Sequence, residues 1–265
     1  MVRKTLLGLL GCTLLASVAL ATEGSPVDIS VSSSVVSKYM WNGFDRVVLS
    51  GLETGPAVQP GVGVGVKGTG LSFNAGGSFV VGDNSELHET TYGVGVVRSL
   101  SPLVTVGAGY TYFDNRVTDA GGVTVPNRDN HEVWGSVELT SSVGVKPGVV
   151  VKYEKPTVTG ADAYTVAVGT LRYAMPLSGV NVGGVGVGLN WTTGVVYNTG
   201  VTVGNVDVVK SGVSAVQVGV SSDLHAGRVV VTPSVNYQVT VEDQVKTVNG
   251  TSNPFWATVG VSYGF

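Results

Sequence analysis

The stretch Phe255-Trp256-Ala257-Thr258-Val259-Gly260-Val261-Ser262-Tyr263-Gly264-Phe265 alternates between two kinds of side chain. Odd-numbered positions are apolar, and even-numbered positions are mostly small or polar. A period of two indicates a β-strand with one apolar face and one polar face. About ten residues is also the length that a tilted strand needs to cross the hydrocarbon layer of a bilayer. The stretch therefore predicts a membrane-crossing β-strand.

Eleven further segments alternate in the same way. Valine, tyrosine, phenylalanine and threonine predominate on one parity, as is usual in strands, and glycine, serine, threonine and asparagine on the other. We interpret the first parity as a lipid face and the second as a lumen face. The pattern predicts an all-β fold, a transmembrane antiparallel up-and-down β-barrel of about 12 strands, over residues 27–36, 57–67, 71–82, 89–99, 103–113, 131–141, 148–156, 162–174, 184–196, 212–222, 228–241 and 255–265.

The connections between these segments alternate in length. Short turns are expected at residues 67–70, 100–102, 142–147, 176–183 and 223–227, and mostly longer polar connections lie between them. Outer-membrane barrels have short periplasmic turns and long extracellular loops. An even number of strands places both ends of the barrel on the periplasmic side, where the first strand pairs with the last. Such closure removes the free sheet edges that lipid would not tolerate.

Composition supports a bacterial outer-membrane protein. Charged residues make up 12% of the chain, about half the usual share for a soluble domain. Residues 1–21 combine Arg3 and Lys4, an apolar run and a small-residue cleavage site, so they are expected to be a signal peptide, with the barrel at 22–265. No later apolar run approaches the roughly 18 residues of a membrane helix. A net charge of −3 provides no basic surface for nucleic acid.

Several motifs resemble a known family. The end of the chain, Tyr263-Gly264-Phe265, is similar to the closing strand of outer-membrane barrels, and the resemblance implies that Tyr263 and Phe265 are recognised by the barrel-assembly machinery. The other motifs resemble the TorF-like family of porin-like barrels, although Asn42 stands where that family usually has arginine. They are Ser37-Lys38-Tyr39-Met40-Trp41-Asn42-Gly43-Phe44, Pro56-Ala57-Val58-Gln59-Pro60, Tyr110-Thr111-Tyr112-Phe113, His131-Glu132-Val133-Trp134-Gly135 and Val151-Lys152-Tyr153-Glu154.

The lumen face carries the candidate functional residues. If the parity holds, the pore-lining candidates are Glu132, Trp134, Glu138, Lys152 and Glu154. A hairpin centred near Gly144 and Val145 would put Glu138 beside Lys152. These charges either compensate each other across the strands or tune ion selectivity at a constriction.

Two regions have two possible interpretations. Tyr39, Trp41 and Phe44 either belong to an interfacial aromatic girdle or form an infolded segment that narrows the pore. The girdle would also include Tyr92, Tyr112, Tyr153, Tyr164 and Tyr237 at the outer strand ends. Arg172 lies where the lipid parity changes from Tyr164, Val166 and Val168 to Leu171 and Tyr173, and a β-bulge there would turn it inward.

Enzyme signatures are weak. The three histidines are His88, His131 and His225, and only His131 lies where it could serve a membrane-derived substrate. No G-x-S-x-G motif accompanies it. We expect no catalytic residue, metal or cofactor. The predicted function is a porin-like channel for passive diffusion of small polar solutes or ions, with lipid as its surroundings. The alternative is a non-conducting structural or partner-binding barrel.

Overall fold

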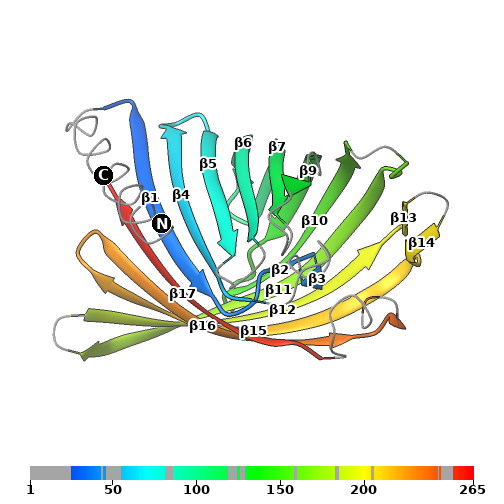
Figure 1. Cartoon of the computed structure of the whole chain (residues 1–265). Coiled ribbons are helices and arrows are strands. Elements are labelled where there is room, and N and C mark those ends of the chain that lie inside the picture. Colours follow the sequence, from blue (N-terminus) through cyan, green and yellow to red (C-terminus); the bar gives the residue numbers. More distant parts are fainter. Residues whose placement is uncertain are drawn as a thin grey trace.

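A computed structural model describes residues 25–42, 44–45, 55–80, 86–118, 124–125, 129–157, 160–182, 185–203, 206–243, 245 and 253–265. The predicted signal peptide lies outside these residues. Twelve antiparallel strands form the wall, and they match the twelve predicted segments (Figure 1). Their bounds are β1 (Val27–Val36), β4 (Ala57–Val66), β5 (Leu71–Val80), β6 (Glu86–Ser101), β7 (Val104–Thr118), β9 (Asn130–Leu139), β10 (Val145–Pro156), β11 (Tyr164–Val182), β12 (Val185–Asn198), β15 (Gly212–Ala226), β16 (Val229–Thr240) and β17 (Phe255–Gly264).

The sheet closes on itself. Consecutive wall strands pair as neighbours, and β1 also pairs with β17, from Ser30 opposite Gly264 to Val36 opposite Thr258. The backbone amide of Phe265 adds a bond to the carbonyl of Ile29 at 2.9 Å. The predicted closed up-and-down barrel is therefore confirmed. The described residues contain no helix that is long and apolar enough to span a membrane.

The two faces of the wall follow the predicted parity on most strands. On β4, Gln59, Gly61, Gly63 and Gly65 lie on the inner face with Ser34, Ser32, Ser30 and Asp28 of β1 directly opposite them. The outer face carries exposed apolar side chains, including Val94, Val137, Val151, Trp191 and Val261. Apolar side chains left exposed around a closed barrel are what hydrocarbon contact requires.

Five short strands lie in the longer connections. They are β2 (Met40–Trp41), β3 (Phe44–Asp45), β8 (Thr124–Val125), β13 (Val201–Val203) and β14 (Val206–Val209). The turn predicted at 176–183 is instead mostly strand, because β11 continues to Val182 opposite Val185. Its register shifts between Pro176 and Asn181, where proline supplies no amide hydrogen to the ladder.

Strand β11 corrects a second prediction. Its pairing with β10 continues in one register from Tyr164 to Tyr173, so no bulge separates Arg172 from Val166. Arg172 has the same parity as Tyr164, Val166 and Val168, and all four lie opposite lumen-facing residues of β10. Arg172 therefore points inward without a bulge. The sequence places Tyr164, Val166 and Val168 on the lipid face, and for Tyr164 the girdle prediction is wrong. Apolar side chains are tolerated inside because the lumen is packed at this level.

The turn between β9 and β10 is shorter than expected. Gly144 adopts a left-handed φ of 79°, and the amide of Ser141 bonds to the carbonyl of Val145 at 2.9 Å. The strand β10 therefore begins at Val145, three residues before the predicted start. Glu138 lies opposite Gly148, and Lys152 lies opposite Trp134. The predicted Glu138–Lys152 pair is wrong, because the turn shifts the register.

Candidate functional site: the lumen and its first connection

The connection after β1 folds into the barrel. Within it, β2 and β3 form a small hairpin with Trp41 opposite Phe44, and Figure 1 shows this hairpin inside the ring of strands. Asn42 has a φ of 49°, a left-handed conformation that asparagine tolerates better than most residues. The side chains of Tyr39 and Phe44 are buried, at 8% and 3% exposure. The infolded alternative is confirmed, and the girdle prediction is wrong for these two residues.

Two side chains anchor the connection to distant parts of the wall. The hydroxyl of Tyr39 donates a hydrogen bond to Oε1 of Glu89 on β6. Nδ2 of Asn42 donates to Oε1 of Glu154 on β10 at 3.2 Å. In the ring, β10 lies six strands from β1 in either direction, so Asn42 reaches the opposite wall. The hairpin therefore crosses the lumen.

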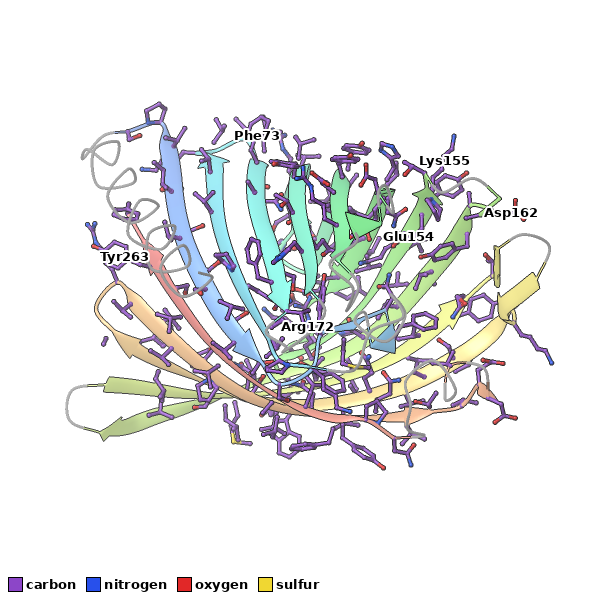
Figure 2. The ribbon with its side chains drawn as sticks, viewed as in Figure 1. Phe73, Glu154, Lys155, Asp162, Arg172 and Tyr263 are labelled. Atoms are coloured by element: carbon purple, nitrogen blue, oxygen red, sulfur yellow. The ribbon has the colours of Figure 1, made fainter. Side chains whose placement is uncertain are left out.

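Glu154 belongs to a charged cluster on β9 and β10. It lies directly opposite Glu132, and Nζ of Lys152 lies 3.0 Å from Oε2 of Glu132. Nδ2 of Asn130 donates a second hydrogen bond to Glu154, at Oε2. Glu132 is 4% exposed and Glu154 is fully buried. Two buried carboxylates thus share one ammonium group, and burial makes unbalanced charge costly. Figure 2 shows Glu154 and its neighbour Lys155 on opposite sides of β10.

We call the lumen beside the long connections the outer half. Its inner-face residues are buried on every wall strand except β17. The set comprises Val36, Ala57, Val80, Glu89, Asn115, Asn130, Glu132, Glu154, Tyr164, Val166, Val196, Asn198, Ala215, Gln238 and Thr240. Tyr164, Val166, Val196 and Ala215 pack together as an apolar cluster on one side. The outer half is therefore filled with protein in this structure.

The inner half lies beside the short turns and is more open. Ser30, Ser32, Ser72 and Asn74 are exposed although they lie on the inner face. Glu138 pairs with Arg172 of β11 across β10, and their side chains are 23% and 56% exposed. Asp223 accepts hydrogen bonds from Asn190 at 2.7 Å and Thr232 at 2.8 Å. Polar groups in this half are satisfied by neighbours yet remain accessible.

The side chain of Trp134 projects from β9 into the lumen, between the outer and inner halves. Its ring lies close to Gly95, Gly107 and Gly109 of β6 and β7, where an added Cβ would collide with the indole. Glycine at these three positions leaves room for the tryptophan inside the barrel. The alternating glycines of the sequence thus accommodate a specific lumen side chain.

All five predicted pore-lining residues lie on the inner face. The structure brings Glu132, Lys152 and Glu154 together, and it leaves Glu138 at the other end of β9 with Arg172. Sequence reasoning missed Asn42 and Asn130 as contributors to the cluster, and it missed the separate anchor between Tyr39 and Glu89. The Asn42-Gly43 dipeptide, a common hairpin turn sequence, was the available signal for a hairpin in the first connection.

The outer surface offers little chemistry. His131 faces outward, and its Nδ1 lies 2.7 Å from the hydroxyl of Tyr110, while its ring is tilted against Tyr112 at 5.2 Å. These contacts resemble an aromatic belt at the membrane interface. Over the part of the chain that the structure describes, no three histidine, cysteine or acidic residues gather as a metal site.

The fold is shared with known outer-membrane proteins. An outer membrane channel from Pseudomonas putida F1 superposes with a TM-score of 0.54 over 91% of this chain and 96% of that one, at 11% identity. The KdgM porin in complex with disordered oligogalacturonate gives 0.52 over 90% and 99%, at 8% identity. LpxR from Salmonella typhimurium gives 0.50 over 88% and 99%, at 12% identity.

At such low identity these likenesses establish the fold alone, that of a bacterial outer-membrane β-barrel. Neither a family model nor a curated protein sequence matches the chain.

Proposed function

We propose that this barrel is a porin-like channel of the outer membrane through which small polar solutes or ions diffuse passively, and that it belongs with the TorF-like barrels. The observation that carries the channel proposal is the polar inner face of the inner half, where Ser30, Ser32, Ser72 and Asn74 are exposed. Hydroxyl, amide and glycine positions offer a solute many weak contacts and no tight trap. The similarity to porins and channels agrees with this function.

The charge of the inner face indicates which solutes the proposed channel would favour. Six carboxylates and three basic side chains project from the paired strands into the lumen. They are Asp28, Glu89, Glu132, Glu138, Glu154 and Asp223, against Lys146, Lys152 and Arg172. Lys67, which follows β4, lies 3.3 Å from Asp28 and balances that carboxylate. An excess of negative charge favours cations and neutral solutes over anions. An acidic oligosaccharide such as the oligogalacturonate in the KdgM complex is therefore a poor candidate.

Planar-bilayer recording of the refolded protein tests the channel. We expect stepwise conductance and a reversal potential in a salt gradient that shows preference for cations over anions. Preference for anions would contradict the charge argument, and absence of steps from a correctly folded barrel would contradict the channel. Heat-modifiable migration in gels would establish folding in either case.

A second candidate function follows from the infolded hairpin. Because the first connection crosses the lumen and buries the outer half, a non-conducting structural or partner-binding barrel is the alternative. Twelve strands lie between small barrels filled by side chains and wide porins, so size does not separate the two. Folded protein without conductance, before and after removal of the hairpin, would favour this alternative.

We also propose that Tyr263 and Phe265 are read by the barrel-assembly machinery. Their rings lie edge to face with centroids 4.5 Å apart at the short-turn end of the seam between β17 and β1. Phe265→Ala is expected to reduce the heat-modifiable form in cells. Phe73→Ala, which removes a half-exposed phenylalanine from the outer face of β5, is the control. Equal assembly of both variants would reject the proposal.

A further inference from the structure

Among the residues that the structure describes, the buried cluster of the outer half contains two carboxylates and one ammonium group. Glu132 and Glu154 are opposite each other in the register, and the basic side chain that the structure pairs with them is Lys152. If the cluster were exposed to water, this excess of negative charge would matter little, because water would solvate each carboxylate. At 4% and 0% exposure it costs several kcal/mol unless another cation or a proton compensates it.

A second observation, at Asn130, points to a ligand. Asn130 is 4% exposed, and its Nδ2 donates to Glu154, so its amide group lies at the cluster. Its Oδ1 is buried and accepts no hydrogen bond. Buried carbonyl oxygens without a donor are uncommon in proteins, and such an atom on an amide that contacts Glu154 is well placed to accept from a guest. Oε2 of Glu132 is buried against Nζ of Lys152 at 3.0 Å.

The partners of the cluster indicate the chemistry of that guest. The hydrogen bonds that Asn42 and Asn130 donate to Glu154 come from N–H groups, and the ion pair to Glu132 comes from an ammonium group. A primary ammonium carries three donors and no acceptor. Two carboxylates and one amide oxygen match that number of donors. A calcium ion would need six to eight oxygen ligands and would lie beside the Lys152 ammonium.

We propose that Glu132, Glu154 and Oδ1 of Asn130 form a subsite for the primary ammonium group of a solute, and that the amide of Asn42 occupies part of it when no solute is bound. The first-connection hairpin therefore competes with the solute for Oε1 of Glu154. Solute binding displaces Asn42 from the opposite wall and loosens one anchor of the hairpin. The proposal depends on the channel function only for the route by which the solute arrives.

Binding to the refolded barrel in detergent tests this subsite without requiring conductance. The probes are butylammonium, tetramethylammonium, which has the charge but no N–H donor, and calcium chloride, and the readouts are ligand-detected NMR and tryptophan fluorescence. We expect butylammonium to bind and tetramethylammonium to bind at least tenfold more weakly. Glu154→Gln and Glu132→Gln should each weaken butylammonium binding about tenfold, which is about 1.4 kcal/mol.

Two further variants separate the subsite from general charge effects. Asn42→Gly keeps the left-handed backbone available but removes the competing amide, so it should tighten butylammonium binding several-fold. Glu138→Gln removes a carboxylate from the same strand, in the inner half, and should leave binding unchanged. Equal binding of both ammonium probes, tighter binding of calcium, or equal effects of Glu138→Gln and Glu154→Gln would overturn the proposal. Variants are compared only where gel migration shows a folded barrel.

Discussion

The outer and inner halves of the lumen are built from the same strands but differ in what fills them. In the outer half, the first connection packs against the wall and buries carboxylates, amides and valines together. In the inner half, serines, asparagine and a Glu138–Arg172 pair remain accessible. The same type of interaction, a glutamate of β9 with a basic residue, therefore occurs in a buried and in an accessible environment. The difference shows how a loop, rather than the strands, sets the environment inside this barrel.

Removal of the hairpin should have the largest effect on this difference. Replacement of residues 39–45 by a glycine-serine linker removes both anchors, to Glu89 and Glu154, and should open the outer half to water. We expect single-channel conductance to rise several-fold. Unchanged conductance in a folded barrel would show that the hairpin does not limit the passage.

Labelling gives an independent measure of the same change. The chain contains one cysteine, Cys12, which lies outside the described residues, so introduced cysteines report on the wall. A maleimide should react with Glu154→Cys only when the hairpin is absent. It should react with Ser32→Cys in both forms, because Ser32 is already exposed. Reaction of Glu154→Cys with the hairpin present would mean that the outer half is open.

Lys152 and Arg172, which pair with Glu132 and Glu138 of β9, allow a matched comparison of how much a buried and an accessible ion pair stabilise the barrel. Lys152→Met leaves Glu132 and Glu154 buried without the ammonium, and loss of one partner from a buried ion pair costs about 3–5 kcal/mol. Arg172→Met removes the partner of Glu138, but that pair is partly exposed, and such pairs contribute about 0–1 kcal/mol. The free energy of unfolding in urea, followed by tryptophan fluorescence, measures both. Equal losses would mean that water solvates the outer cluster as well as the inner one.

The outer surface could be predicted from sequence because contact with lipid requires an apolar side chain at every second residue of a strand. Val58, Val62 and Val66 must all be apolar, so the constraint repeats along each strand and around the ring. Closure between β1 and β17 followed from the same constraint, since lipid does not tolerate a free edge. The lumen has no comparable repeating rule. Its residues must suit individual neighbours, and those neighbours come from distant parts of the chain.

Three particular failures illustrate this limit. Tyr164, Val166 and Val168 are apolar but face inward, because packing in the outer half favours apolar side chains as lipid does. Glu138 pairs with Arg172 because Gly144 closes a tighter turn than the sequence suggested, and a shift in register changes every cross-strand partner. The Asn42–Glu154 contact joins residues 112 positions apart through a loop, so no local pattern encodes it.

The smallest expected effect is a difference in stability between alanine variants of two lumen glycines. Gly109 lies in the packed part of the lumen beside Trp134, and Gly65 lies in the open part. A Cβ at Gly109 would lie 2.6 Å from the carbonyl oxygen of Val94 and would collide with the ring of Trp134, whereas a Cβ at Gly65 meets no atom within 4 Å. Gly109→Ala should therefore cost about 1–3 kcal/mol through overpacking. Gly65→Ala should be neutral or stabilise by up to about 1 kcal/mol, because alanine restricts the unfolded chain.

Urea unfolding of the two alanine variants, side by side with the unchanged protein, measures this contrast. Because both glycines lie on the inner face of the wall, Gly65 on β4 and Gly109 on β7, strand propensity and lipid exposure affect them alike. A stability loss confined to Gly109→Ala would therefore locate the packed region at Trp134. Equal losses would mean that glycine is required along the whole inner face to allow the wall to bend, and the distinction between a packed and an open part of the lumen would have to be abandoned.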